Sequence, residues 1–232
     1  MSYALRSIAF VAELIHPPVK HEPRGLQNLH SELFESSDCD YRDFRMIPGG
    51  AQFSNSPQNA LPGTPVSVAN VLADRIQVRE EQTGVSKEDF EARLSSLARN
   101  ALNVLPMQLF MVQQFAVRSV INPHTSNDAR AFMTQTVFGH DESMLSVFPA
   151  PPSLSGMRFT FPPDAETQAV FNVRLESYSQ DNRSLFLENV GTFGKPVTSA
   201  ELPELTQRFA STYDFLQGQV IDFVSQFDTE DV

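Results

Sequence analysis

Tryptophan is missing from this sequence of 232 residues, and cysteine occurs once, at Cys39. One cysteine cannot form an intramolecular disulfide or a cysteine-rich zinc site, so we expect a reducing, cytoplasmic location. No apolar run reaches the roughly eighteen residues that a membrane-spanning helix needs. The apolar run at residues 8–15 is interrupted by Glu13 and lacks the basic flank and cleavage site of a signal peptide. We therefore expect neither secretion nor contact with a membrane.

Positive charge is also scarce. The chain has 17 Lys and Arg against 28 Asp and Glu, which gives a net charge of -11 and a pI near 4.8. This balance argues against charge-driven binding to nucleic-acid backbones or anionic lipid. Residues 117–232, with 7 basic and 15 acidic side chains, hold -8 of the total. Within residues 201–232 Arg208 is the single cation among seven acids, so the end of the chain should present an acidic surface.

Phenylalanine, in contrast, is abundant, with 19 residues in a chain of 41% apolar content. A chain of this length can bury about 70% of its unfolded surface. Its clearest pattern lies at residues 86–105, where apolar side chains recur every three or four residues from Phe90 onward. Ser86 is a favourable N-cap, Asp89 lies in the first turn and Pro106 ends the run. The pattern predicts an amphipathic helix that covers a sheet.

The other periodic segments predict further strands and helices. Strand patterns occur at residues 5–15, 41–47, 51–54, 65–81 (one long or bent strand), 109–121, 144–148, 157–161, 169–178 and 184–193. Helical spacing occurs at residues 25–34, 128–138 and 202–227. Thr198 and Glu201 have the spacing of a capping box before the last of these helices, which carries an aromatic stripe that includes Phe209 and Phe223.

Together these segments predict an α+β fold. We expect a largely antiparallel sheet with amphipathic helices packed on one face and a long C-terminal helix. The first choice for domain organisation is a single domain, 1–232. Because a strand followed by an amphipathic helix occurs three times, two α+β halves, about 1–122 and 123–232, are the alternative.

Two short motifs resemble those of a known family. The segment His16-Pro17-Pro18-Val19 follows an apolar strand, and the segment at 116–122 carries Arg118 and Asn122 in a predicted central strand. In these motifs, and in its C-terminal strand and long helix, the chain is similar to a sporadically distributed bacterial family of comparable length that has no agreed function. The resemblance implies a bacterial protein and transfers no catalytic residue.

Residues able to bind a metal, or to act as acid and base, are densest around the predicted helix at 128–138. They are His124, Asp128, His140, Asp141 and Glu142. This cluster defines one alternative function, a metal-assisted hydrolase, although helix caps and solvated loop residues explain it more simply. We expect His16 and His21 to be exposed loop histidines. Cys39 should be a poor nucleophile because its two aspartate neighbours raise the pKa of its thiol.

Three arginines in predicted strands, Arg118, Arg158 and Arg174, define a second alternative. If they share a sheet face with nearby Phe115, Phe159 and Phe171, they would form a platform for single-stranded nucleic acid. The simpler interpretation is a polar sheet face whose phenylalanines point into the core on alternate residues.

The sequence contains no nucleophile elbow, P-loop or dinucleotide-binding fingerprint. We therefore expect no cofactor and no catalytic residue, and our first hypothesis is a non-enzymatic interaction or accessory subunit of a bacterial protein complex. The acidic C-terminal helix favours a basic protein as the partner, contacted through Glu204, Asp214, Asp222 and Asp228. The sequence leaves the partner's identity and the oligomeric state open.

Overall fold

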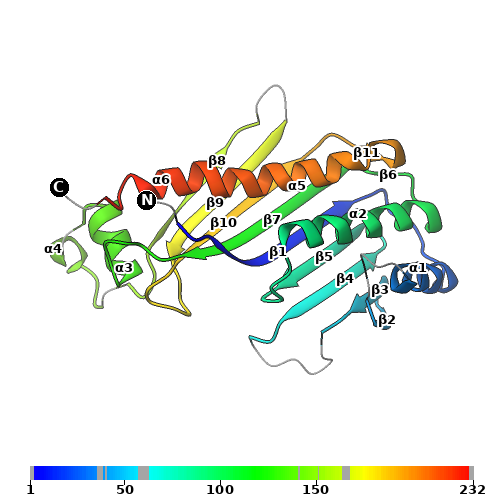
Figure 1. Cartoon of the computed structure of the whole chain (residues 1–232), viewed down its shortest axis with the longest axis horizontal. Helices are drawn as coiled ribbons and strands as arrows, with labels where there is room; N and C mark the ends of the chain where they lie inside the picture. The colour runs from blue at the N-terminus through cyan, green and yellow to red at the C-terminus, as the bar shows by residue number, and fades with distance from the viewer. Residues whose placement is uncertain are drawn as a thin grey trace.

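The computed structural model describes residues 3–35, 39, 41–56, 63–140, 142–150, 152–163 and 168–229. Within these residues nine strands form one antiparallel sheet, and long helices cover one of its faces (Figure 1). This is the α+β fold, with a largely antiparallel sheet and a long C-terminal helix, that the sequence patterns predict.

The order of strands across the sheet is β2-β3-β4-β5-β1-β7-β10-β9-β8, and every neighbouring pair is antiparallel. The strands are β1 (Arg6–Ile15), β2 (Asp43–Ile47), β3 (Gly50–Ser54), β4 (Val66–Leu72), β5 (Arg75–Glu81), β7 (Val112–Ile121), β8 (Gly156–Phe161), β9 (Ala169–Ser177) and β10 (Leu185–Phe193). Two short strands, β6 (Leu109–Phe110) and β11 (Val197–Thr198), pair separately. The two strands at the centre of the sheet, β1 and β7, are therefore about a hundred residues apart in the sequence.

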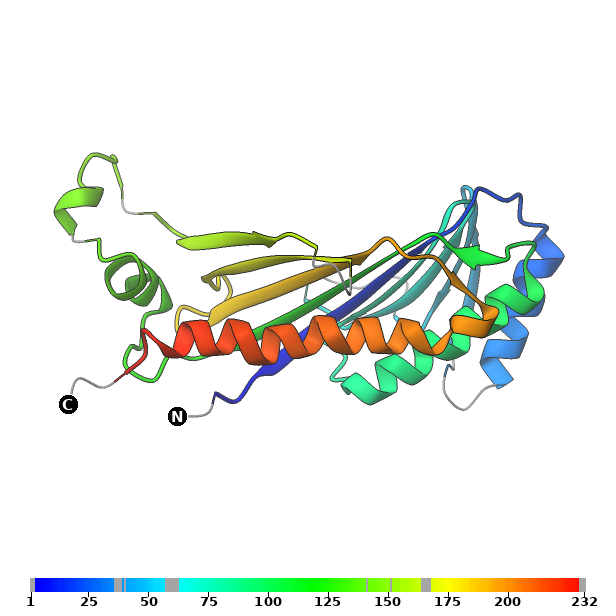
Figure 2. The same ribbon diagram turned by 90° about the horizontal axis from the view of Figure 1, so that it is seen from above.

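The helices lie mainly on one side of the sheet, as Figure 2 shows from above. They are α1 (Pro23–Glu35), α2 (Lys87–Val104), α3 (Ala129–Ala131), α4 (Glu142–Leu145), α5 (Pro203–Phe215) and α6 (Ile221–Ser225), with π-helical η1 (Phe132–Val137) and η3 (Leu216–Val220) and 3-10 helix η2 (Ser199–Glu201). Segments α5, η3 and α6 form one continuous rod, which we call the long helix. The capping box of Thr198 and Glu201 is present before it.

The core is centred on phenylalanines from both central strands and both long helices. Phe90 of α2 and Phe209 of α5 meet with ring centroids 4.8 Å apart, and both rings lie 5.4 Å from Phe10 of β1. Phe115 of β7 lies 6.0 Å from Phe209. All four side chains are buried, at 3% exposure or less, so this phenylalanine cluster joins the two helices to the middle of the sheet.

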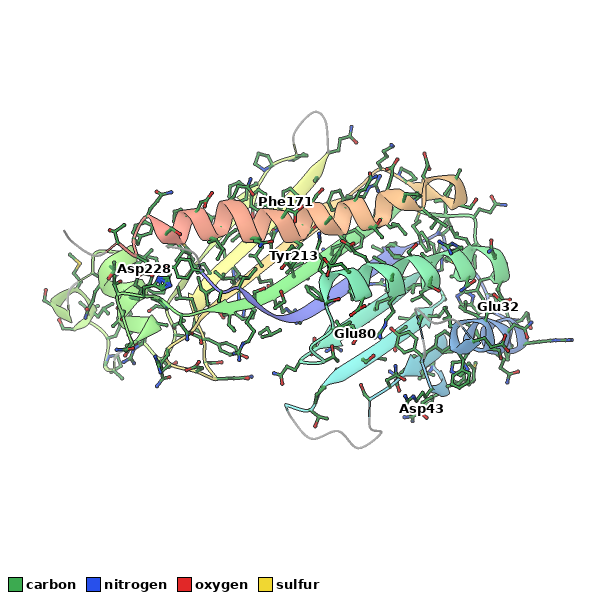
Figure 3. The ribbon with its side chains drawn as sticks, in the orientation of Figure 1. Glu32, Asp43, Glu80, Phe171, Tyr213 and Asp228 are labelled. Carbon is green, nitrogen blue, oxygen red and sulfur yellow. The ribbon has the colours of Figure 1, made fainter. Side chains whose placement is uncertain are left out.

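Two buried polar pairs connect the helices to the sheet away from this cluster. Glu80 of β5, whose side chain is fully buried, accepts hydrogen bonds from Arg93 of α2 and from Ser67 of β4 (Figure 3). Asn189 of β10 donates to the backbone carbonyl of Thr212 in α5, at 2.8 Å. Buried polar groups are normally paired in this way because an unpaired one is destabilising.

Three sequence predictions need correction. The segment 65–81 is a hairpin of β4 and β5, not one strand, because the chain reverses at Ala73 and Asp74. Residues 144–148 form the end of α4 and a turn instead of a strand. They are mostly exposed, so no neighbouring strand stabilises an extended conformation there. The strand at 109–121 is interrupted at Met111, whose backbone N–H bonds to the carbonyl of Ile15.

No helix among the described residues is long and apolar enough to cross a bilayer.

Candidate partner-binding groove

An apolar groove of about 490 Å³ lies between the edge strand β8 and the long helix. Its lining residues are Phe159, Phe161, Val173, Leu175, Phe215, Gln219, Val220, Phe223 and Gln226. None of these side chains is charged. Uncovered apolar surfaces of this kind mark binding sites for proteins or small ligands, because water is displaced favourably from them.

The strand wall of the groove follows from the alternation of side chains along β8. Phe159 and Phe161 are two residues apart, so both point to the helix side of the sheet. The ring of Phe159 lies 5.4 Å from Phe223, and the ring of Phe161 lies 5.1 Å from Phe215. Phe161 is 39% exposed, although it faces the helix. The groove is therefore partly filled by its own aromatic rings and still open to solvent.

The helix wall contains the π-helical turn η3. A π-helix has i→i+5 hydrogen bonds and more residues per turn than an α-helix. The turn therefore shifts the direction in which the side chains after it point. With this change Val224 is fully buried on the core side, while Phe215 and Phe223 both face β8. π-Helical turns inside α-helices occur frequently at functional sites.

The outer edge of β8 has no partner strand among the residues that the structure describes. Just before β8, the N–H of Ser177 donates to the carbonyl of Ser155 at 2.9 Å. Bonded and non-bonded pairs alternate along an antiparallel ladder, and the register continues unbroken through β8. The backbone N–H and C=O groups of Gly156, Arg158 and Thr160 therefore point away from β9, toward the open edge.

The three arginines proposed to bind nucleic acid do share one sheet face, opposite the helices. Arg118, Arg174 and Arg158 lie in one cross-strand row in which Glu188 separates the first two. Arg118 pairs with Glu188 at 2.5 Å, and Arg174 pairs with Glu176 at 2.7 Å. Arg158 is exposed and makes no ion pair with a described residue. Most of the positive charge in this row is thus neutralised by glutamates.

The phenylalanines expected beside those arginines lie on the opposite, helix-covered face. Phe115 contacts Phe209 in the core, and Phe159 lines the groove. Phe171 stacks on Phe215 beneath the long helix, with centroids 4.6 Å apart (Figure 3). The arginines and these phenylalanines therefore lie on opposite faces of the sheet. This is the simpler arrangement, which the alternation of residues along each strand predicts.

The four acidic residues proposed as partner contacts lie in different environments. Asp214 and Asp222 are exposed on the long helix. Glu204 is occupied by ion pairs with Lys195, at 3.1 Å, and with Arg208. The hydrogen bond from Lys195, with help from Arg208, lowers the pKa of Glu204. Asp214 lies 3.9 Å from the ammonium group of Lys87, so Asp222 fits the expected acidic surface most directly.

Asp228, the fourth of these residues, is buried at 6% exposure and does not belong to that surface (Figure 3). Its carboxylate accepts hydrogen bonds from the hydroxyl of Tyr3, from the backbone N–H of His124 and from both the N–H and the hydroxyl of Thr125. Burial alone would raise the pKa of Asp228, but these hydrogen bonds outweigh burial and lower it. Burial and the contact with Asp228 raise the pKa of Tyr3. Asp228 thus connects the end of the chain to its beginning.

The proposed metal cluster is not assembled in the described residues. His124 stacks on Tyr3, Asp128 caps α3, and His140 contacts Phe138. Asp141 and the side chain of Glu142 lie outside the described residues. Across the described part of the chain, no three His, Cys, Asp or Glu side chains gather in a way that would hold a metal ion.

The prediction that His16 is exposed is wrong, because the turn between β4 and β5 packs over it and leaves it fully buried. Its N–H bonds to the carbonyl of Asp74, and a ring nitrogen of His21 lies 2.8 Å from the carbonyl of Leu72. Burial lowers the pKa of His16. Cys39 is also fully buried, as a structural cysteine would be. The histidines fix the loop after β1 and take no part in the groove.

The sequence does not reveal the groove, because its walls come from separate segments: strands β8 and β9 and the helical residues 215–226. The available signal is the pair Phe159 and Phe161 at alternate positions of one predicted strand, together with Phe223 near the end of the helical stripe. No protein-family model matches this chain, and no curated protein is similar enough to indicate a family.

Proposed function

We propose that this protein is a non-enzymatic interaction protein, an accessory subunit of a bacterial protein complex, that holds a partner protein in the apolar groove beside β8. The observation that carries the proposal is the groove itself. Its lining residues are uncharged and include four phenylalanines, one of which, Phe161, is 39% exposed. Aromatic side chains in partly open pockets are frequent anchors of protein interfaces.

A basic partner remains part of the proposal because of the charges beside the groove. Asp222 is exposed on the helix turn between Gln219 and Gln226, which both line the groove. Residues three or four apart on a helix are surface neighbours, so a cation bound beside the groove would reach Asp222. Such a contact would steer association and depend on salt concentration.

The metal-assisted hydrolase and the nucleic-acid platform stay predictions. In the described residues their side chains are divided among helix caps, stacking contacts and ion pairs. The apolar groove therefore supports the interaction hypothesis better than either alternative.

The test compares two exposed phenylalanines. Phe161→Ser removes an aromatic ring from the groove, whereas Phe34→Ser removes a 55% exposed ring from α1, at the other end of the sheet. The native protein and both variants would be used to capture partners from a bacterial lysate, and the captured protein would be titrated by calorimetry. We expect Phe161→Ser to weaken binding about ten-fold or more and Phe34→Ser to have little effect. Equal binding by all three proteins would contradict the proposal.

A further inference from the structure

This inference rests on the proposed function. It concerns the conformation of the partner segment in the groove, which the free backbone edge of β8 determines. The backbone groups of Gly156, Arg158 and Thr160 that point outward are a row of donors and acceptors without a partner strand in the described chain. Such a row is a template for another strand. At the opposite edge, β2 is flanked by α1 through a contact of His30 with Phe44, with ring centroids 5.5 Å apart. Both edges lack an outer strand among the described residues, but only the β8 edge is described with an apolar groove beside it.

An added strand would place its side chains in two different environments. It would lie about 4.8 Å from β8 and alternate its side chains between the two faces of the sheet. On the helix side its neighbours would be Met157, Phe159 and Phe161, with Phe215 and Phe223 across the groove. Every second residue of the occupant would therefore be apolar.

Charge determines the residues on the other face. Arg158 lies directly opposite Arg174 across the β8–β9 pair, and Arg174 already pairs with Glu176 and Glu188. Like charges placed directly opposite each other are destabilising, and opposite charges stabilise. An acidic side chain on the added strand, next to Arg158, would offset the repulsion between Arg158 and Arg174.

A second copy of this chain that paired through its own β8 would not supply that acidic group. If β8 paired with itself, Arg158 would face Arg158, Thr160 or Gly156 of the other copy, because only outward-pointing residues form bonded pairs across a new ladder. None of these carries a carboxylate. The pairing would also bring together two chains of net charge -11. The charges therefore disfavour pairing of β8 with itself, whereas an acidic segment of another protein fits Arg158.

We infer that the free edge of β8 binds an extended segment of another protein as a tenth strand of the sheet. The segment has apolar side chains at alternate positions, which enter the groove, and an acidic side chain opposite Arg158 on the other face. A cation at the groove side of the partner, near Asp222, is compatible with this arrangement, since the two charges lie on opposite faces.

The test uses a short fluorescein-labelled peptide in which leucine alternates with glutamate, titrated with the full chain and followed by fluorescence anisotropy. Thr160→Pro removes an N–H that points away from β9, so the β8–β9 ladder is left intact. Thr160→Val is the matched control, because it keeps that N–H. We expect Thr160→Pro to weaken binding about ten-fold and Thr160→Val to leave it nearly unchanged. Equal affinities for the two variants would overturn the inference.

Charge reversal gives a second measurement that does not depend on proline. The native chain should prefer the glutamate peptide to one in which lysine replaces glutamate, and Arg158→Glu should invert that preference. Circular dichroism and urea unfolding would confirm that the variants are folded. An unchanged preference in Arg158→Glu would count against the inference, as would equal binding of a peptide in which the leucines are consecutive.

Other occupants of the groove would give different results. The peptide could fail to bind while a fluorescent fatty acid binds the native chain but not Phe161→Ser. That result would show that the groove holds a small apolar ligand and not an added strand. Sedimentation could show that the native chain is a dimer and that Thr160→Pro is a monomer. That result would show that the occupant is a second copy of this chain. If a captured partner depends on Phe161 but not on the N–H of Thr160, the strand inference fails while the proposed function stands.

Discussion

The two halves of the sheet are built alike on either side of the β1–β7 pair, but they end differently. In each half the central strand, β1 or β7, pairs with the last long strand before a long helix, β5 or β10, and earlier strands continue outward. In the first half α1 packs against β3 and α2, and His30 contacts both Phe44 and Phe53 near the edge. In the second half the corresponding helices, α3 and α4, lie near one end of the sheet (Figure 2). Both edge strands lack an outer partner among the described residues, but α1 packs near the β2 edge, whereas an apolar groove lies beside β8.

This difference indicates that the helices following the central strand determine which part of the sheet keeps an uncovered apolar surface. Both halves bury a strand-to-helix polar contact, Glu80 with Arg93 in one and Asn189 with Thr212 in the other. Both contribute a helix phenylalanine to the same core cluster. What distinguishes them is one covering helix, and the apolar groove lies where that helix is missing.

The largest expected effect tests whether the halves share one core. Phe90 and Phe209 are both fully buried and touch each other, so Phe90→Ala and Phe209→Ala should each lower the free energy of unfolding by about 3–5 kcal/mol. The double variant should lose less than the sum, because each substitution removes part of the same contact. Urea unfolding measures all three values. Strictly additive losses, or two separate transitions, would indicate halves that unfold independently.

A smaller effect should separate the two buried polar pairs. Glu80→Ala leaves the guanidinium of Arg93 without its carboxylate and should lower the free energy of unfolding by about 3 kcal/mol. Asn189→Ala removes one neutral hydrogen bond to the carbonyl of Thr212 and should lower it by about 1 kcal/mol. Thermal and urea unfolding of both variants provide the measurement. An equal or reversed order would show that the charge on the first pair adds nothing to stability.

A third effect, which depends on pH, concerns the residue that links the end of the second half to the start of the first. Asp228→Asn should lower the free energy of unfolding at neutral pH by about 1–3 kcal/mol, because the charged acceptor of several hydrogen bonds is lost. The folded pKa of Asp228 is lowered, so its stabilisation is present above the ordinary value of 3.8 and is lost as the pH falls through the lowered pKa.

The difference between the native chain and Asp228→Asn should therefore shrink in acid. Urea unfolding at pH 7 and near pH 3 tests this. The control is Asp222→Asn, an exposed site, which should change stability by less than about 0.5 kcal/mol at either pH. A constant difference between native chain and Asp228→Asn would contradict the role of the carboxylate charge.

Local pattern was sufficient to predict most elements of this fold. The helix at 86–105 and the C-terminal helix follow from apolar spacing and from caps at Ser86 and Thr198, which the structure contains. The strands at 169–178 and 184–193 follow from their largely apolar, partly alternating patterns and the turn residues between them. These features depend on neighbouring residues, which a sequence displays directly.

Features that depend on distant residues could not be predicted in this way. Nothing near Arg6–Ile15 indicates that its partner is Val112–Ile121. The acidic count at the C-terminus predicts a surface, but it cannot show that Asp228 turns inward to Tyr3. Helical spacing of constant period does not predict the π-helical turn that directs Phe223 toward β8.

The central position of β1 has a consequence for the order in which the chain can fold. During synthesis from the N-terminus, β1 can pair with β5 once residue 81 is available, but its other edge stays unpaired until β7, at 112–121, emerges. A partly synthesised chain therefore exposes the middle of the final sheet as a bare edge, the kind of surface on which nascent chains aggregate. The acidic and basic side chains of Glu13 and Arg6 on β1 are then its available protection against pairing with another chain.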